Sequence, residues 1–258
     1  MKLKVGVCEA APEMDPRTES WRRLTGLVRE AEIDVFLINE MPFGLWLSAG
    51  ESFDLSGWKK CLEVHERGME KLDELGVNVV LGSRARELNG LRVNEAFVWT
   101  PNAGYQAVHT KQYFPDEDGY YEARWFQPGE RHFRVAQAGP VRVGFLICTE
   151  VMFNEHARHY GRDGAQVIAV PRAVGKWSLS RWLVAMKMAA TVSGCYVMTS
   201  NRSGIDSKGQ EFGGRGWIVD PRGDMVAQTS VASSVVTYNI DLDCVATAQS
   251  EYPCYVKE

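Results

Sequence analysis

The stretch "PVRVGFLICTEVMFNEHARHYGRDGAQVIAVPR" at residues 140–172 predicts the class of fold. An apolar, β-rich run at 140–147 is followed by a helix-like segment at 154–164 and a second apolar run at 165–172. Strand, helix and strand in this order are typical of α/β proteins. Cys148 stands directly after the first run. Taken alone, a cysteine there is more typical of a buried core residue than of a nucleophile.

The same alternation extends along the chain and predicts one α/β domain over residues 1–258. Strands outnumber helices, which suits sheets packed on each other with helices outside, although the pattern alone leaves this open. Further helices are predicted at 20–32, 56–76 and 178–194. Further strands are predicted at 3–10, 34–38, 78–84, 94–100, 105–111, 195–201 and 233–242, with a hairpin at 216–228.

Composition excludes several classes of protein. The 258 residues carry a net charge of −4, so no basic surface for nucleic acid or an anionic membrane is expected. No apolar run approaches the length of a membrane span, and the first residues lack the features of a secretion signal. The six cysteines are scattered, which favours reduced thiols over a disulfide framework. We therefore expect a soluble, cytoplasmic protein.

Residues 112–132 form a long, polar and aromatic segment without a regular pattern. Such segments are more often functional than idle, and the aromatic content argues against disorder. Aromatic residues here and elsewhere are candidate walls of a substrate pocket: Trp46, Tyr113, Tyr120, Tyr121, Trp125 and Trp177. Arg172, directly after an apolar run, is a weaker candidate for binding a charged group, and an ion pair is the alternative interpretation.

Common cofactor and metal motifs are absent from the sequence. There is no phosphate-binding P-loop, zinc-protease helix, EF-hand loop or serine nucleophile elbow. His156 and His159 lie near Glu155 on a predicted helix, but a polar helix face explains them better than a metal site. No metal and no cofactor are predicted.

Three reactive residues follow three predicted strands. Glu40 comes after the run at 34–38, Lys111 after "YQAVHT", and Cys148 after "VRVGFLI". Ligands of α/β sheets collect at the carboxyl ends of strands, so these side chains are expected to meet. A carboxylate can take the proton of a thiol and return it to a leaving amine, and a lysine can stabilise the resulting oxyanion.

In these residues and their order the chain resembles the nitrilase superfamily of carbon–nitrogen hydrolases. The resemblance covers nearly the whole chain: "KVGVCEAAPEMD", "VFLINEMPFG", "HTKQYFPDEDGYYEARWFQPGE", the stretch quoted above, "SNRSG" and "GGRGWIVDPRGDMVA". It implies that Glu40 is the general base, that Lys111 is the catalytic lysine and that Cys148 is the nucleophile.

The resemblance carries further expectations. It implies a four-layer α–β–β–α sandwich and homodimers or larger assemblies built from the helices near 154–163 and 178–193. It places the family's second glutamate at Glu122, where it would orient Lys111. The oxyanion hole would consist of Lys111 and the backbone N–H of Thr149. Chain length and the "GYYEARWFQPG" segment are more similar to amidases and carbamoyl-amine hydrolases than to the longer nitrilases.

The sequence departs from the family's commonest pattern around the cysteine. Thr149 replaces an aromatic residue, Glu150 replaces the aspartate that is usual in amidases, and Asn154 replaces a proline. Three functions therefore stay open: hydrolysis of a small-molecule amide or carbamoyl group through a thioester, hydrolysis of a nitrile by the same residues, and a binding protein without turnover. Glu150 is the main support for the nitrile hypothesis.

Overall fold

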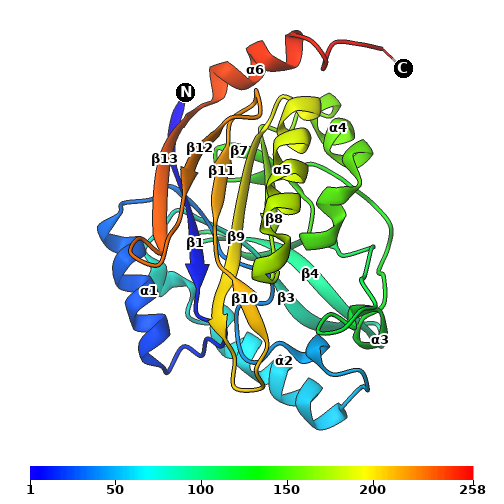
Figure 1. Ribbon diagram of the computed structural model, residues 1–258. Helices are drawn as coiled ribbons and strands as arrows, with labels where there is room; N and C mark the ends of the chain where they lie inside the picture. Colours follow the sequence, from blue (N-terminus) through cyan, green and yellow to red (C-terminus); the bar gives the residue numbers. More distant parts are fainter. Residues whose placement is uncertain (258) are drawn as a thin grey trace.

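The computed structural model describes residues 1–257, so Glu258, the last residue of the predicted domain, lies outside the described residues. Within them the strands form two sheets with helices on both outer faces (Figure 1). The first sheet, in the order β13–β1–β2–β3–β4–β5, consists of β1 (Lys2–Ala10), β2 (Val35–Leu37), β3 (Val79–Leu88), β4 (Leu91–Thr100), β5 (Gly104–Thr110) and β13 (Val235–Asp241).

The second sheet runs in the order β12–β11–β9–β8–β7–β6, and β10 pairs with β9. Its strands are β6 (Ala136–Ala138), β7 (Val141–Phe145), β8 (Val167–Pro171), β9 (Tyr196–Ile205), β10 (Glu211–Gly213), β11 (Trp217–Val219) and β12 (Met225–Gln228). The central strands of each sheet are parallel, and the outer pairs are antiparallel. Glu9 and Ala10 of β1 pair with Asn201 and Arg202 of β9, which joins the two sheets at one end.

Helices cover the outer face of each sheet. The first sheet carries α1 (Glu19–Glu30) and α2 (Leu55–Met69), and the second carries α4 (Asn154–Arg162) and α5 (Leu179–Ser193). Short helices are η1 (Leu47–Ala49), η2 (Leu72–Leu75), α3 (Glu122–Trp125), η3 (Cys148–Met152) and η4 (Lys176–Ser178), and α6 (Leu242–Ser250) follows β13. Among residues 1–257, no helix has both the length and the apolar character needed to cross a bilayer.

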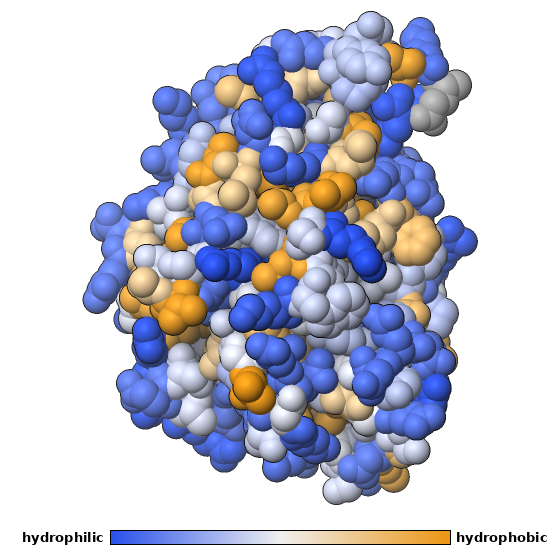
Figure 2. All heavy atoms as spheres, in the orientation of Figure 1, coloured by the Kyte–Doolittle hydropathy of each residue, from blue (hydrophilic) through white to orange (hydrophobic). Residues whose placement is uncertain are grey.

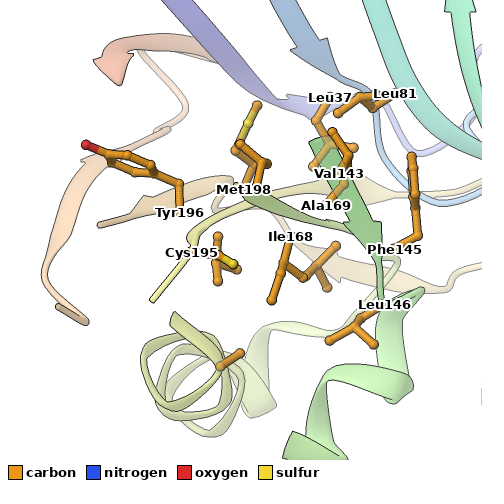
Figure 3. Packing of buried hydrophobic residues seen from close by; sticks show 14 of the residues in the cluster. Leu37, Leu81, Val143, Phe145, Leu146, Ile168, Ala169, Cys195, Tyr196 and Met198 are labelled. Carbon is orange, nitrogen blue, oxygen red and sulfur yellow. The ribbon is translucent and has the colours of Figure 1, made fainter. Parts of the chain in front are cut away.

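The alternation of side chains along each strand builds the layers. Figure 3 shows Leu37 and Leu81 of the first sheet facing Val143 and Ala169 of the second, while Ile168 points to the opposite face, toward a helix. Because β8 is buried on both faces, its sequence is continuously apolar rather than alternating, and in β7 only Arg142 interrupts the buried run. The predicted four-layer α–β–β–α sandwich is confirmed.

Several element boundaries differ by a few residues from the sequence-based predictions, and two differences concern helices. The helix predicted at 56–76 ends at Met69, and the separate turn η2 follows before Gly76, whose φ of +68° terminates it. After the last predicted strand, where no further element was expected, the chain forms α6. Asp241 caps that helix by accepting a hydrogen bond from the N–H of Asp243.

Candidate active site

Lys111 lies between two carboxylates in the interior of the protein. Its Nζ donates to Oε1 of Glu40 at 2.8 Å and to Oε2 of Glu122 at 2.6 Å. None of the three side chains is more than 1% exposed. Glu40 comes from the end of β2, Lys111 follows β5 and Glu122 opens α3. Since removing one partner would leave a buried charge uncompensated, the three residues behave as one electrostatic unit.

The two oxygens of Glu40 have different surroundings. Oε1 accepts hydrogen bonds from Lys111 and from Nδ2 of Asn94, the latter at 2.8 Å. Oε2 is buried and has no hydrogen-bond partner among the described residues. Asn94 also anchors the lysine, because its carbonyl accepts the N–H of Lys111 at 2.9 Å. The carboxylate is therefore held through one oxygen while the other can accept a proton.

Cys148 begins η3, three residues after β7 ends at Phe145. Its φ is +49°, a conformation that residues with a side chain rarely adopt. Such strain is concentrated at functional sites, where it fixes the direction of a side chain. The thiol is 3% exposed. The backbone N–H of Ala173, just after β8, donates toward its sulfur.

The charges of the lysine and the glutamates act on the thiol. Burial and the nearby Glu40 raise the pKa of Cys148 well above 9.0, and Lys111 only partly offsets them. Burial also raises the pKa of Glu122 to about 8, against the opposing effect of Lys111. Burial opposes the charge of Lys111, but the two glutamates outweigh it and raise its pKa. At neutral pH the thiol is protonated and needs a base to become a nucleophile.

The other predicted site residues lie in three places. Thr149 directly follows the cysteine in η3 and is half-buried. Arg172 is fully buried at the end of β8, where its guanidinium stacks on Trp217 at 4.1 Å and Nε donates to Oγ1 of Thr199 at 2.6 Å. Burial lowers the pKa of Arg172 to about 9, although the charge of Cys148 opposes this effect. The recorded contacts of Arg172 are thus structural.

Tyr113 and Trp125 contact groups other than Glu40, Lys111 and Cys148, the three residues of the candidate catalytic triad. The hydroxyl of Tyr113 lies 2.7 Å from Nε2 of His156, and its ring packs on Phe153 at 4.3 Å. Nε1 of Trp125 donates to the carbonyl of Gly50 at 2.6 Å. The neighbouring histidine considered as a metal ligand, His159, instead faces Asp163 in the next turn.

Trp177 and Tyr120 lie together beside Gly175, next to the segment that carries Ala173. Trp177 is 70% exposed, whereas the hydroxyl of Tyr120 is buried. Burial raises the pKa of Tyr120, and the charges of Cys148 and both glutamates add to the effect. Of the predicted aromatic pocket residues, Tyr120 is the one on which the charges of Cys148 and the glutamates act, and Trp177 lies beside it at Gly175.

Sequence reasoning missed two residues, Asn94 and His109. Both are buried polar residues within strands, and a buried asparagine in the apolar run "VNEAFV" is a detectable signal. His109 contacts Glu150 through its Nε2 at 2.9 Å. The partners of this pair are 41 residues apart, so local sequence carries no sign of the contact.

A cavity of about 660 Å³ lies between residues 13–18 and the start of α2, and its lining includes Trp125, Lys60 and Lys208. Glu40, Lys111 and Cys148 do not line this cavity, and all three are buried.

Residues 4–249 match the sequence model of the carbon-nitrogen hydrolase family. The chain belongs to this family. It is similar to N-carbamoylputrescine amidase of Arabidopsis thaliana, with 28% identity over 88% of this chain and 82% of that protein. This carbon–nitrogen hydrolase is also similar to a nitrilase of Pyrococcus abyssi, with 30% identity over 63% of this chain and 58% of the nitrilase.

The fold of this hydrolase matches solved structures. A carbon-nitrogen hydrolase from Helicobacter pylori superposes with a TM-score of 0.84 over 98% of this chain and 94% of that chain, at 20% sequence identity. At this identity the likeness establishes the shared architecture alone.

Proposed function

We propose that this carbon–nitrogen hydrolase cleaves a small amide or carbamoyl group through a thioester on Cys148. The observation that carries the proposal is the position of the buried Lys111. Glu40 and Glu122 hold its ammonium group, and the charges of all three residues act on the thiol of Cys148. A lysine so placed is a fixed positive charge at the point where an oxyanion would form.

In the proposed acylation, Oε2 of Glu40 takes the proton of the Cys148 thiol, and the thiolate attacks the carbonyl carbon. Lys111 and the N–H of Thr149 stabilise the oxyanion. When the tetrahedral intermediate collapses, the C–N bond breaks and Glu40 passes its proton to the departing ammonia or amine. The acyl group stays on sulfur as a thioester.

In the proposed deacylation, Glu40 takes a proton from water and the hydroxide attacks the thioester. The C–S bond breaks, and the proton on Glu40 returns to the sulfur, which releases the acid and restores the thiol. A carbamoyl substrate would release carbon dioxide, ammonia and an amine overall. Glu122 does not enter the proton transfer; its contact with Nζ at 2.6 Å supports a role in orienting Lys111.

A nitrile is the second candidate substrate, and the similarity to the nitrilase of Pyrococcus abyssi favours it. Glu150 no longer supports this alternative, because its side chain is fully buried and both oxygens are occupied by protein groups. Initial rates on matched amide and nitrile substrates distinguish the two functions. We expect the amide to be hydrolysed faster.

We also propose a homodimer or larger assembly built on α4 and α5, and a cytoplasmic location. In the orientation of Figure 1, Figure 2 shows apolar side chains gathered over the area where α5 runs. Trp177, Val184 and Met188 are between 47% and 70% exposed, whereas Tyr160 and Met186 belong to the core. All six cysteines are free thiols, which supports a reducing compartment.

Intact-mass spectrometry during turnover tests the proposed function. An adduct of the acyl mass on wild-type protein, absent from Cys148→Ala, is expected with at least one amide or carbamoyl substrate. Because Cys244 is exposed and can be modified, peptide mapping must place the adduct on Cys148. Full turnover by Cys148→Ala would overturn the proposal.

A further inference from the structure

Glu150 joins the backbone next to the nucleophile to the backbone next to the catalytic lysine. Its Oε2 accepts the N–H of Ile147 at 2.7 Å, and its Oε1 accepts the N–H of Gln112, also at 2.7 Å. Ile147 precedes Cys148, and Gln112 follows Lys111. One carboxylate thus bridges the two segments whose side chains must act on the same carbonyl group.

His109 holds this carboxylate in place from β5. Its Nε2 lies 2.9 Å and 3.1 Å from the two oxygens of Glu150, and its Nδ1 lies 3.0 Å from the carbonyl of His132. A carbonyl oxygen can only accept, so Nδ1 carries a hydrogen. Since Glu150 already accepts two backbone N–H groups, it is best satisfied as an anion, and Nε2 then also donates. The geometry therefore requires His109 to be a cation.

We propose that His109 and Glu150 form a charged positioning pair that fixes the Cys148 turn against the strand end carrying Lys111. Neither residue touches the reacting atoms, and each acts through the backbone that it holds. The expected effect of the pair on the reaction rate rests on the proposed function. The charge state of the pair does not depend on which substrate is hydrolysed.

Electrostatics support the charged form of the pair. Burial alone would lower the pKa of His109, but the charge of Glu150 and the hydrogen bonds to Glu150 and to the carbonyl of His132 together outweigh burial and raise it. A histidine with a raised pKa contributes stability below its ordinary pKa, and this contribution is lost as pH rises through the raised value. The contribution of the pair is therefore lost on the alkaline side of the ordinary histidine pKa.

Neighbouring titratable groups do not take the proton that the pair holds on His109. His156 of α4 feels the charges of both His109 and Glu150, and burial lowers its pKa, so it is neutral at neutral pH. The phenol of Tyr160 is buried with a raised pKa and stays neutral as well. Of the other titratable groups, Glu122 feels the charge of Glu150, Arg131 and Glu155 act on His156, and the carbonyl of His132 faces Nδ1 of His109.

Kinetics of His109→Gln and Glu150→Gln test the positioning role, with His159→Gln, an exposed histidine on α4, as the matched control. Each pair variant should lower kcat by about 100-fold, as expected for a misplaced reacting group, with KM close to that of wild type. The double variant should be no worse than either single variant, because the two residues act as a unit. Glu150→Asp, which keeps the charge, should recover part of kcat.

The pH profile separates positioning from mere stability. Wild-type kcat should fall on the alkaline side as His109 loses its proton, and His109→Gln should lack this step. Unchanged kcat in both variants, or a loss confined to KM, would overturn the proposal. So would a selective loss of nitrile turnover in Glu150→Gln, because that result would make Glu150 a substrate contact.

NMR of the imidazole nitrogens in wild-type protein gives a test that needs no variant to fold. At neutral pH both nitrogens of His109 should carry hydrogen, with His159 titrating normally in the same spectra. A neutral His109 would overturn the positioning pair even if the enzyme is fully active. Conversely, a protonated His109 in a protein without an acyl-enzyme would count against the proposed function and not against the pair.

Discussion

Nζ of Lys111 lies 2.6 Å from Oε2 of Glu122, and both side chains are buried beside a second carboxylate. Burial raises the pKa of Glu122, and the neighbouring Glu40 adds to the rise. Lys111 opposes both effects without cancelling them, so the pKa of Glu122 is raised even though a cation touches it.

The stability of the protein should depend on pH through Glu122. Burial raises the pKa of Glu122 from 4.5 to about 8, so the folded state keeps a proton that the unfolded chain has lost. Stability should therefore decline as pH rises from 4.5 to about 8 and then level off. Glu122→Gln, which cannot titrate, should lack this decline when both proteins are unfolded with urea across that range. If the stability of wild type and of Glu122→Gln changed with pH in the same way, the raised pKa of Glu122 would be contradicted.

Replacing Lys111 with methionine should abolish activity and lower the free energy of unfolding by roughly 3–5 kcal/mol, because two buried carboxylates lose their cation. Adding Glu40→Gln and Glu122→Gln to Lys111→Met should restore part of this loss. Urea denaturation measures both effects. Lys59→Met, on an exposed position of α2, is the control and should change stability by less than about 0.5 kcal/mol.

Glu40→Gln should still fold, because Glu122 remains to compensate the charge of Lys111 and the amide oxygen can accept from Lys111 and Asn94. It should lower kcat by roughly 10²–10⁴-fold, the usual contribution of a general base. Steady-state kinetics on an amide substrate check this, and Glu63→Gln on the exposed face of α2 should match wild type. Wild-type turnover by Glu40→Gln would exclude Glu40 as the base.

Glycine should be better tolerated than alanine at position 148. The φ of +49° strains any side chain there, whereas glycine adopts this conformation freely. Cys148→Gly should be at least as stable as Cys148→Ala in thermal unfolding, and both should be inactive. At Cys195, a buried cysteine without positive φ, the order should reverse by about 0.5–1 kcal/mol. The same order at both positions would show that the turn is not strained.

Much of the fold could be predicted because local pattern and tertiary structure agree. The apolar runs before Glu40 and Cys148 form strands that are buried except at Arg142, and such strands have a clear sequence signal. The helix α6 was missed because its residues "LDCVATAQS" follow a strand without a break, although Asp241 is a good cap. β6, with the sequence "AQA", has weak strand propensity and forms because it pairs with β7.

The candidate site was less predictable than the fold, since most of its contacts join distant segments. Glu150 shows this best: its position after the cysteine suggested a substrate role, and the structure instead gives it His109 and two backbone partners. Trp125 and Tyr113 were chosen for residue type alone, and their recorded contacts are with other parts of the protein. Residue type predicts chemistry, but the direction of a side chain depends on packing.

The pairing of β1 with β13 has a consequence for the order of synthesis. Lys2 pairs with Asp241 and Cys8 with Val235, so one side of β1 finds its partner only after β13 is made. Until then that side presents unpaired backbone groups and invites pairing with other chains. A nascent chain that stalls before β13 is therefore an aggregation hazard.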